Sequence, residues 1–172
     1  MLTSLNLAQT QLCGLDKYGN GTYTADGITA IAYALRVSGG LTSVELRGNR
    51  LGDEGWGAIF AAICGNKDSK IISMDASSED IGPAGVKLIA EALRTSVTGS
   101  LTSINLSEHN LTNYGRDMTG IKQLAAALGV NGSLTVTNLL SNQLDAESAK
   151  MLAEVAKQKG ISLCGIQRPD HC

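Results

Sequence analysis

A repeated pattern of apolar residues is the feature that most limits how this chain can fold. One kind of segment recurs about every 30 residues, with starts at Leu2, Leu41, Ile71, Leu101, Leu134 and Ile161. Apolar residues fill most of the positions three and five residues after each start. A unit this short cannot bury its apolar face alone, so we expect neighbouring units to stack and share one continuous core.

Each unit combines a short strand with a helix. In the unit that opens at Leu101, a short alternating segment is followed by the helical pattern Gly120, Ile121, Leu124 and Leu128. These spacings place the apolar residues on one face of a helix. A small residue stands at the same helix position in every unit that has a helix, namely Gly27, Gly55, Gly85, Gly120 and Ser148. Since every strand returns through a helix, the strands should be parallel.

The sequence therefore predicts an α/β fold, a right-handed solenoid that forms one domain over residues 1–172. A parallel sheet of about six strands should line the concave face, with the helices on the convex face. The chain enters its first strand at Leu2 and Leu5 without a polar cap. Either the first layer is exposed, or the chain is a piece of a longer array, or this end self-associates with a second copy.

Composition limits the partners and the setting. The net charge of −2 makes nucleic acid and anionic membranes poor partners, and the sequence has no apolar run of about 18 residues that would span a membrane. Four widely spaced cysteines, Cys13, Cys64, Cys164 and Cys172, are too few for a disulfide scaffold. We therefore expect a reduced, intracellular (cytoplasmic) setting.

The pattern LxxLxLxxNxL, with Asn49 and Asn142 at its asparagine position, resembles the leucine-rich repeat family. The long helix pattern GxxxIAxAL is similar to the ribonuclease-inhibitor-like subclass, which includes NOD-like receptors and Ran GTPase-activating proteins. The resemblance implies a protein-interaction scaffold that is not an enzyme and needs no cofactor. Thr10, Glu79 and His109 replace the asparagine, so whether the backbone bonds that asparagine makes in the family form in those three units stays open.

The resemblance also implies that the concave face binds a protein partner. We predict that the solvent-facing strand positions carry this contact: Ser43, Glu45, Arg47, Ser73, Asp75, Ser103, Asn105, Val136, Asn138, Leu140 and Leu163. Val136, Leu140 and Leu163 should form an exposed apolar cluster, as contact surfaces often do. The alternative is a solvated sheet face that binds nothing tightly.

Two other functions stay open at this point. The chain could be a structural repeat array with no partner of its own. It could also be a GTPase activator of the Ran-activating type, which would need a suitably placed arginine, and Arg47 and Arg50 are the candidates.

The insertion between Leu12 and Gly27 resembles a calcium-binding EF-hand loop, with Asp16, Asn20 and Thr22 at ligand positions. Gly27 stands where the loop needs a bidentate glutamate. A glycine-rich surface loop that holds no metal is therefore the favoured interpretation.

Five further residues depart from their surroundings. We expect Trp56 in the core and Phe60 at a helix surface, where it could contact a partner. Cys164 should be buried and inert. His171 and Cys172 lack the spacing of a zinc site.

Overall fold

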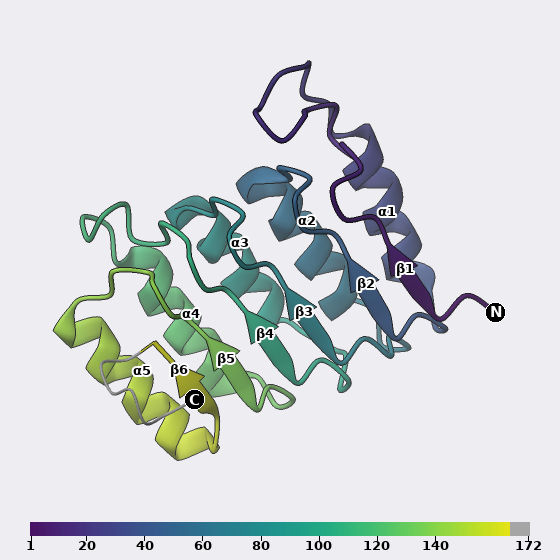
Figure 1. Cartoon of the computed structure of the whole chain (residues 1–172). Helices are drawn as coiled ribbons and strands as arrows, with labels where there is room; N and C mark the ends of the chain where they lie inside the picture. The colour runs from purple at the N-terminus through teal and green to yellow at the C-terminus, as the bar shows by residue number, and fades with distance from the viewer. Residues whose placement is uncertain (166–172) are drawn as a thin grey trace.

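Strands and helices alternate along the chain and build an arc with the strands inside and the helices outside (Figure 1). The computed structural model describes residues 1–165, so His171 and Cys172 lie outside the described residues. The strands are β1 (Ser4–Asn6), β2 (Ser43–Glu45), β3 (Ser73–Asp75), β4 (Ser103–Asn105), β5 (Val136–Asn138) and β6 (Ser162–Cys164). The helices are α1 (Asp26–Val37), α2 (Gly52–Cys64), α3 (Pro83–Arg94), α4 (Thr119–Val130) and α5 (Ala146–Lys159).

The predicted α/β solenoid is confirmed, and every paired strand is parallel to its neighbour. The central residue of each strand points into the core, as Met74 of β3 and Ile104 of β4 do. One detail differs from the prediction. The strands form two sheets, β1–β2 and β3–β4–β5–β6, so the sheet is interrupted between the second and third units.

Helix positions follow from local sequence. Pro83 opens α3, where its missing N–H costs no helix bond. Asp145 caps α5 by accepting a 2.7 Å hydrogen bond from the N–H of Ser148, and Gly160 ends that helix with a φ of 67°. None of these helices is long and apolar enough to cross a membrane.

Trp56 and Phe60 are both on α2 and lie in the hydrophobic core. Neither side chain has exposed surface, and their ring centroids are 6.4 Å apart. The expectation for Trp56 is confirmed. The expectation for Phe60 is wrong, because this helix position faces the core in the central units: Ala90 and Ala125, which hold it in the next two units, are buried as well.

The last strand has a register one residue away from the predicted one. Leu163 pairs with Thr137, which places its side chain in the core at 4% exposure. A shift by one residue exchanges the two faces of a strand, so Leu163 points into the core, where its side chain is removed from water. The predicted solvent-facing position of Leu163 is therefore wrong. Cys164 is buried as expected, but it is disulfide-bonded rather than an inert thiol.

A ladder of buried polar side chains ties the turns of neighbouring units together. Asn49 Oδ1 accepts from the N–H groups of Thr10 and Leu12 at 3.1 and 3.0 Å. Asn49 Nδ2 donates to the carbonyls of Leu7 and Leu46 at 2.6 and 2.9 Å. One side chain thus bonds four backbone groups from two neighbouring units.

His109 makes the same kind of bonds, which answers for this unit the question that the sequence left open. Its Nδ1 accepts from the N–H groups of Ile81 and Glu79 at 3.2 and 3.4 Å. Its Nε2 lies 2.6 Å from the carbonyl of Ala76. Since a carbonyl only accepts and an N–H only donates, the proton must sit on Nε2. Imidazole replaces the amide here because it also carries one donor and one acceptor.

Candidate binding surface

The concave face collects ten of the eleven predicted contact residues, all except Leu163. Each of the ten is at least partly exposed, either on strands β2 to β5 or just after them. Val136 and Leu140 are 37% and 45% exposed. Because Leu163 points into the core, the predicted apolar cluster is reduced to these two side chains.

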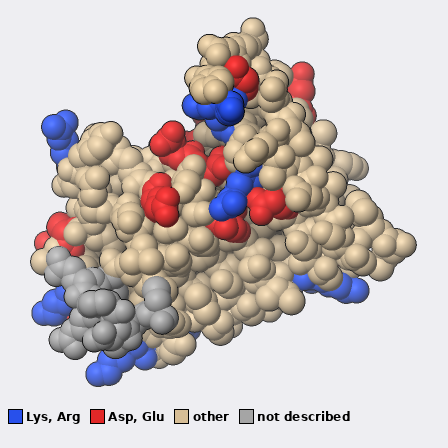
Figure 2. Space-filling model, viewed as in Figure 1, with Lys and Arg blue, Asp and Glu red and all other residues tan. Residues whose placement is uncertain are grey.

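Arg47 stands at the centre of a group of charges on this face (Figure 2). Its Nε lies 3.5 Å from Glu45 Oε1, and its Nη1 lies 3.5 Å from both Asp75 Oδ2 and Ser77 Oγ. About half of the Arg47 side chain remains exposed. Such surface pairs stabilise a fold by only about 0–1 kcal/mol, so Arg47 could exchange these partners for those of another protein at low cost.

The row Asp75, Asn105 and Asn138 has a structural role that the sequence did not reveal. Asp75 Oδ1 accepts from the N–H of Ser77 at 3.0 Å, and Asn138 Oδ1 accepts from the N–H of Leu140 at 3.0 Å. Asn105 makes the equivalent bond one unit away. Each side chain closes the turn that follows its own strand. These residues therefore hold the face in shape, and only part of their polar surface stays free.

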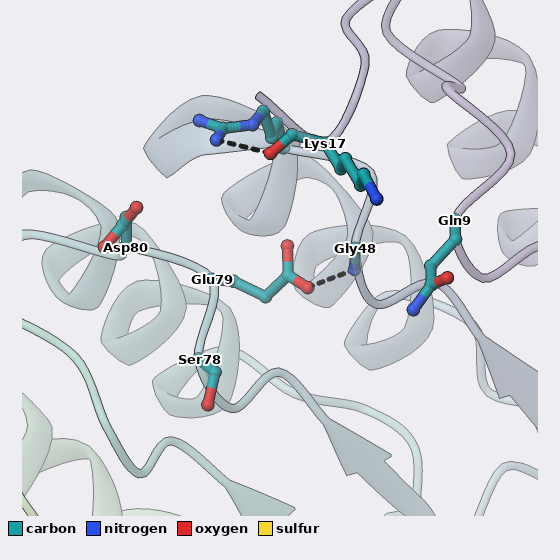
Figure 3. A pocket seen from close by; sticks show the side chains of 7 residues that line it. Gln9, Lys17, Gly48, Ser78, Glu79 and Asp80 are labelled. Carbon is teal, nitrogen blue, oxygen red and sulfur yellow. Dashed lines mark hydrogen bonds between the residues drawn. The ribbon is translucent and has the colours of Figure 1, made fainter. Parts of the chain in front are cut away.

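A pocket of about 240 Å³ lies beside Arg47, at the loops that follow the first three strands (Figure 3). Its walls come from three units and from the insertion: Gln9, Lys17, Gly48, Arg50, Ser78, Glu79 and Asp80. Arg50 Nη2 donates to the carbonyl of Lys17 at 2.9 Å, which fixes the insertion over the second unit. The pocket thus has two cations on one side and two carboxylates on the other.

Glu79 is the buried carboxylate of this pocket. Its Oε1 accepts from the N–H of Gly48, which lies across the interruption in the sheet. Burial raises the pKa of Glu79, and the charge of Asp80 adds to the rise. The Gly48 N–H, the nearby Trp56 indole and the charge of Arg47 lower the pKa and so oppose the rise. The indole N–H itself has no partner in hydrogen-bonding geometry.

The insertion folds into a turn held by its own aspartate. Asp16 Oδ1 accepts from the N–H groups of Tyr18 and Asn20 at 2.9 and 2.8 Å, and Oδ2 accepts from Asn20 Nδ2 at 3.0 Å. These bonds lower the pKa of Asp16. Thr22 is exposed. Within residues 1–165, no three side chains of His, Cys, Asp or Glu are grouped to hold a metal.

The sequence did not single out most of the pocket. Arg47 and Arg50 were considered as activator arginines, and both are held by partners within the chain. Gln9, Lys17 and Asp80 carry no motif, and the fold alone brings them together. The only signal in the sequence was the long insertion, which implied extra surface near the first unit.

Repeated strand–turn–helix units, parallel inner strands and the buried asparagine ladder together define the class. The chain is a leucine-rich repeat protein. No protein-family model matches its sequence.

A human protein is similar to it in sequence. The sequence is 32% identical over 168 residues to the human NACHT, LRR and PYD domains-containing protein 13. That match covers 97% of this chain, which spans 14% of the relative's length.

Two solved structures share the fold. Leiomodin-1 Actin-Binding Site 2 superposes with a TM-score of 0.66 at 18% identity, covering 91% of this chain and 80% of the other. The Caenorhabditis elegans tropomodulin C-terminal domain superposes with a TM-score of 0.61 at 15% identity, covering 92% and 84%. At these identities the likeness concerns the fold alone.

Proposed function

We propose that this chain is a non-catalytic module that binds a partner protein with its concave face. The contact would centre on Arg47 and on the pocket beside it, where Lys17 and Arg50 face Glu79 and Asp80. This grouping of opposite charges is the observation that carries the proposal. Complementary charges steer encounter and set the register of a partner, and weakly paired surface charges can be re-paired across an interface.

Actin is a concrete first partner to test, because a solved domain of the same fold is described as an actin-binding site. The similarity to human NACHT, LRR and PYD domains-containing protein 13 also supports an interaction role. In that setting the chain would serve as one part of a larger protein. An intracellular location belongs to the same proposal.

Two charge-reversal variants test whether binding depends on the concave face or only on the total charge of the protein. The concave variant carries Lys17→Glu, Arg47→Glu and Arg50→Glu. The matched control carries Arg36→Glu, Lys150→Glu and Lys157→Glu, which are exposed on helices α1 and α5 and change the net charge equally.

Binding to actin would be measured by co-sedimentation, and binding to proteins from cells by proximity labelling followed by titration of each purified candidate. We expect the concave variant to lose at least tenfold in affinity, since interface charge pairs often contribute more than 1.4 kcal/mol. The control variant should bind like the original chain. Equal binding by the two variants would exclude this surface.

Self-association through the ends of the solenoid remains a separate proposal. Met1 and Leu2 are exposed, so the first unit offers apolar surface to a second copy. Light scattering over a range of concentrations would detect a dimer, and Leu2→Lys should abolish it. A monomer at all concentrations would reject the idea.

A further inference from the structure

Backbone hydrogen bonds join neighbouring strands at every junction of the described chain except one. Where β3 meets β4, the N–H of Ala76 donates to the Asn105 carbonyl at 3.0 Å, and the N–H of Ser78 donates to the Ser107 carbonyl at 3.1 Å. Equivalent bonds join β1 to β2 and β4 to β5. Strands β2 and β3 instead belong to separate sheets, and no backbone bond links them within residues 1–165.

Two departures from the repeat coincide with this interruption, one at each end of β3. The first is Ile72. Four other units carry a threonine at this position, and in the three that follow another unit the hydroxyl groups of Thr42, Thr102 and Thr135 donate to a carbonyl of that preceding unit at 3.0, 3.4 and 3.2 Å. Ile72 has no hydroxyl, and its side chain is 57% exposed. The bond that would join the start of β3 to β2 is therefore lost.

The second departure is Glu79, which occupies the ladder position of Asn49 and His109. An ionised carboxylate accepts hydrogen bonds and cannot donate one, whereas asparagine and histidine do both. Glu79 takes the N–H of Gly48. In the other units the N–H at the position of Gly48 donates to a carbonyl just after the next strand, as Ser78 does to Ser107. At the β2–β3 junction that acceptor would be the Ser77 carbonyl. The side chain thus replaces the backbone bond at the other end of β3.

Side chains and helix packing hold this junction instead. Arg47 reaches across it to Asp75, with 3.5 Å between Nη1 and Oδ2. On the outer side, Asp53 Oδ1 accepts from the N–H of Gly82 at 2.8 Å. Helices α2 and α3 pack so closely that a Cβ added at Gly57 would lie 2.8 Å from the Cβ of Leu88. The helix side of the junction is therefore tight, and the sheet side is held by exchangeable surface contacts.

We propose that the junction between β2 and β3 is a hinge that pivots on the contact between α2 and α3. Ile72 and Glu79 divide the solenoid into one block of two units and a second block that contains the rest of the described chain. Opening the hinge widens the sheet side and flattens the concave face, and the pocket that contains Gly48 and Glu79 widens with it. This motion is a property of the fold and does not depend on the identity of a partner.

Spin labels on exposed strand positions measure the motion directly. One pair, Ser4→Cys on β1 with Val136→Cys on β5, lies on opposite sides of the β2–β3 junction. The other pair, Ser73→Cys with Ser162→Cys, lies within the second block between β3 and β6. Cys13 and Cys64 are buried free thiols, which slows their labelling under native conditions. We expect the distance distribution of the first pair to be about twice as broad as that of the second, since collective hinge motions populate several arrangements.

Restoring the repeat should close the hinge. The double variant Ile72→Thr and Glu79→Asn introduces residues that other units already carry, and it should narrow the first distribution to the width of the second. The control Ile72→Val and Asp80→Asn removes a neighbouring charge while leaving both departures in place, so it should leave the first distribution broad. Equal widths for the two pairs, or no narrowing in the double variant, would overturn the proposal.

Amide hydrogen exchange in the unmodified chain gives a second measurement that needs no variant. The N–H of Leu106 is bonded to the Asn138 carbonyl, and Leu46 is the equivalent residue at the junction. Since no backbone acceptor of the described chain protects the Leu46 amide across the junction, it should exchange at least about tenfold faster than that of Leu106. Similar rates for the two amides would contradict a hinge.

Discussion

Replacing His109 by alanine should destabilise the chain by about 3 kcal/mol. The side chain is 6% exposed, and its ring serves the N–H groups of Ile81 and Glu79 and the carbonyl of Ala76. Each buried backbone group left unpaired costs about 1–3 kcal/mol. The 3.4 Å bond to Glu79 is long and contributes little, and water that enters the vacated space recovers part of the loss. The estimated loss in the free energy of unfolding therefore comes mainly from two bonds, those to the Ile81 N–H and the Ala76 carbonyl.

Asparagine at the same position should preserve most of this stability, because Asn49 accepts from two N–H groups and donates to carbonyls at the equivalent position of its own unit. Urea unfolding followed by circular dichroism would compare the variants. With a slope of about 2 kcal/mol per molar urea, His109→Ala should lower the midpoint by roughly 1.5 M. His109→Asn should lower it by roughly 0.5 M or less. Equal loss in both variants would mean that ring volume, and not hydrogen bonding, is what the fold requires.

The same residue predicts a dependence on pH. Burial lowers the pKa of His109 below its ordinary value of 6.5, although the Ala76 carbonyl and the charges of Asp80, Glu108 and Asp53 oppose the shift. A second proton would sit on Nδ1, which faces two N–H donors. The unfolded chain binds protons more readily than the folded chain, so stability is complete above pH 6.5 and falls as the pH drops below it.

Comparing His109→Asn with the original chain isolates this effect. Glu79 has a raised pKa, so its protonation favours the folded chain as the pH falls. Since both proteins retain Glu79, its contribution cancels in the difference. We expect the stability difference between the proteins to change between pH 7.5 and pH 5, with the original chain losing more. A difference that stays constant would refute the lowered pKa of His109.

Three further predictions concern stability and can be read from the same unfolding measurements. Asn49→Ala should cost about 3 kcal/mol, because it removes the partner of the Thr10 and Leu12 N–H groups and of the Leu46 carbonyl; a loss under 1 kcal/mol would show that water replaces the amide. Gly57→Val should cost about 1–3 kcal/mol, since the added carbons would overlap Leu88; an unchanged midpoint would mean that α2 and α3 can separate freely. Leu163→Ala should cost about 2–3 kcal/mol, whereas Val136→Ala should cost under about 0.5 kcal/mol; the reverse order would restore the register predicted from sequence.

The class of fold could be read from the sequence because the repeat itself states it. Apolar residues at strand and helix spacings, with a small residue at each helix start, leave few arrangements other than stacked strand–helix units. The positions of all five helices and the parallel strands followed from that pattern. The ladder role of Asn49 followed from the resemblance to the leucine-rich repeat family.

Individual departures from the repeat were harder to interpret. His109 differs from asparagine in name, yet it offers the same donor and acceptor, so the ladder continues. Glu79 differs in the same position and lacks the donor, so the sheet is interrupted beside it. Phe60 and Leu163 were misplaced because one depends on the packing of neighbouring helices and the other on a register shift of one residue.

The sequence alone determined the solenoid, because the same apolar pattern recurs in each unit. A departure at one position of one unit does not hide the pattern that the other units share. Only the tertiary structure decided which side chains meet on the concave face. Lys17 and Asp80 are far apart in the chain, and they line one pocket because the insertion folds back over the second unit. Such a contact occurs once and has no period, so it leaves no pattern in the sequence to read.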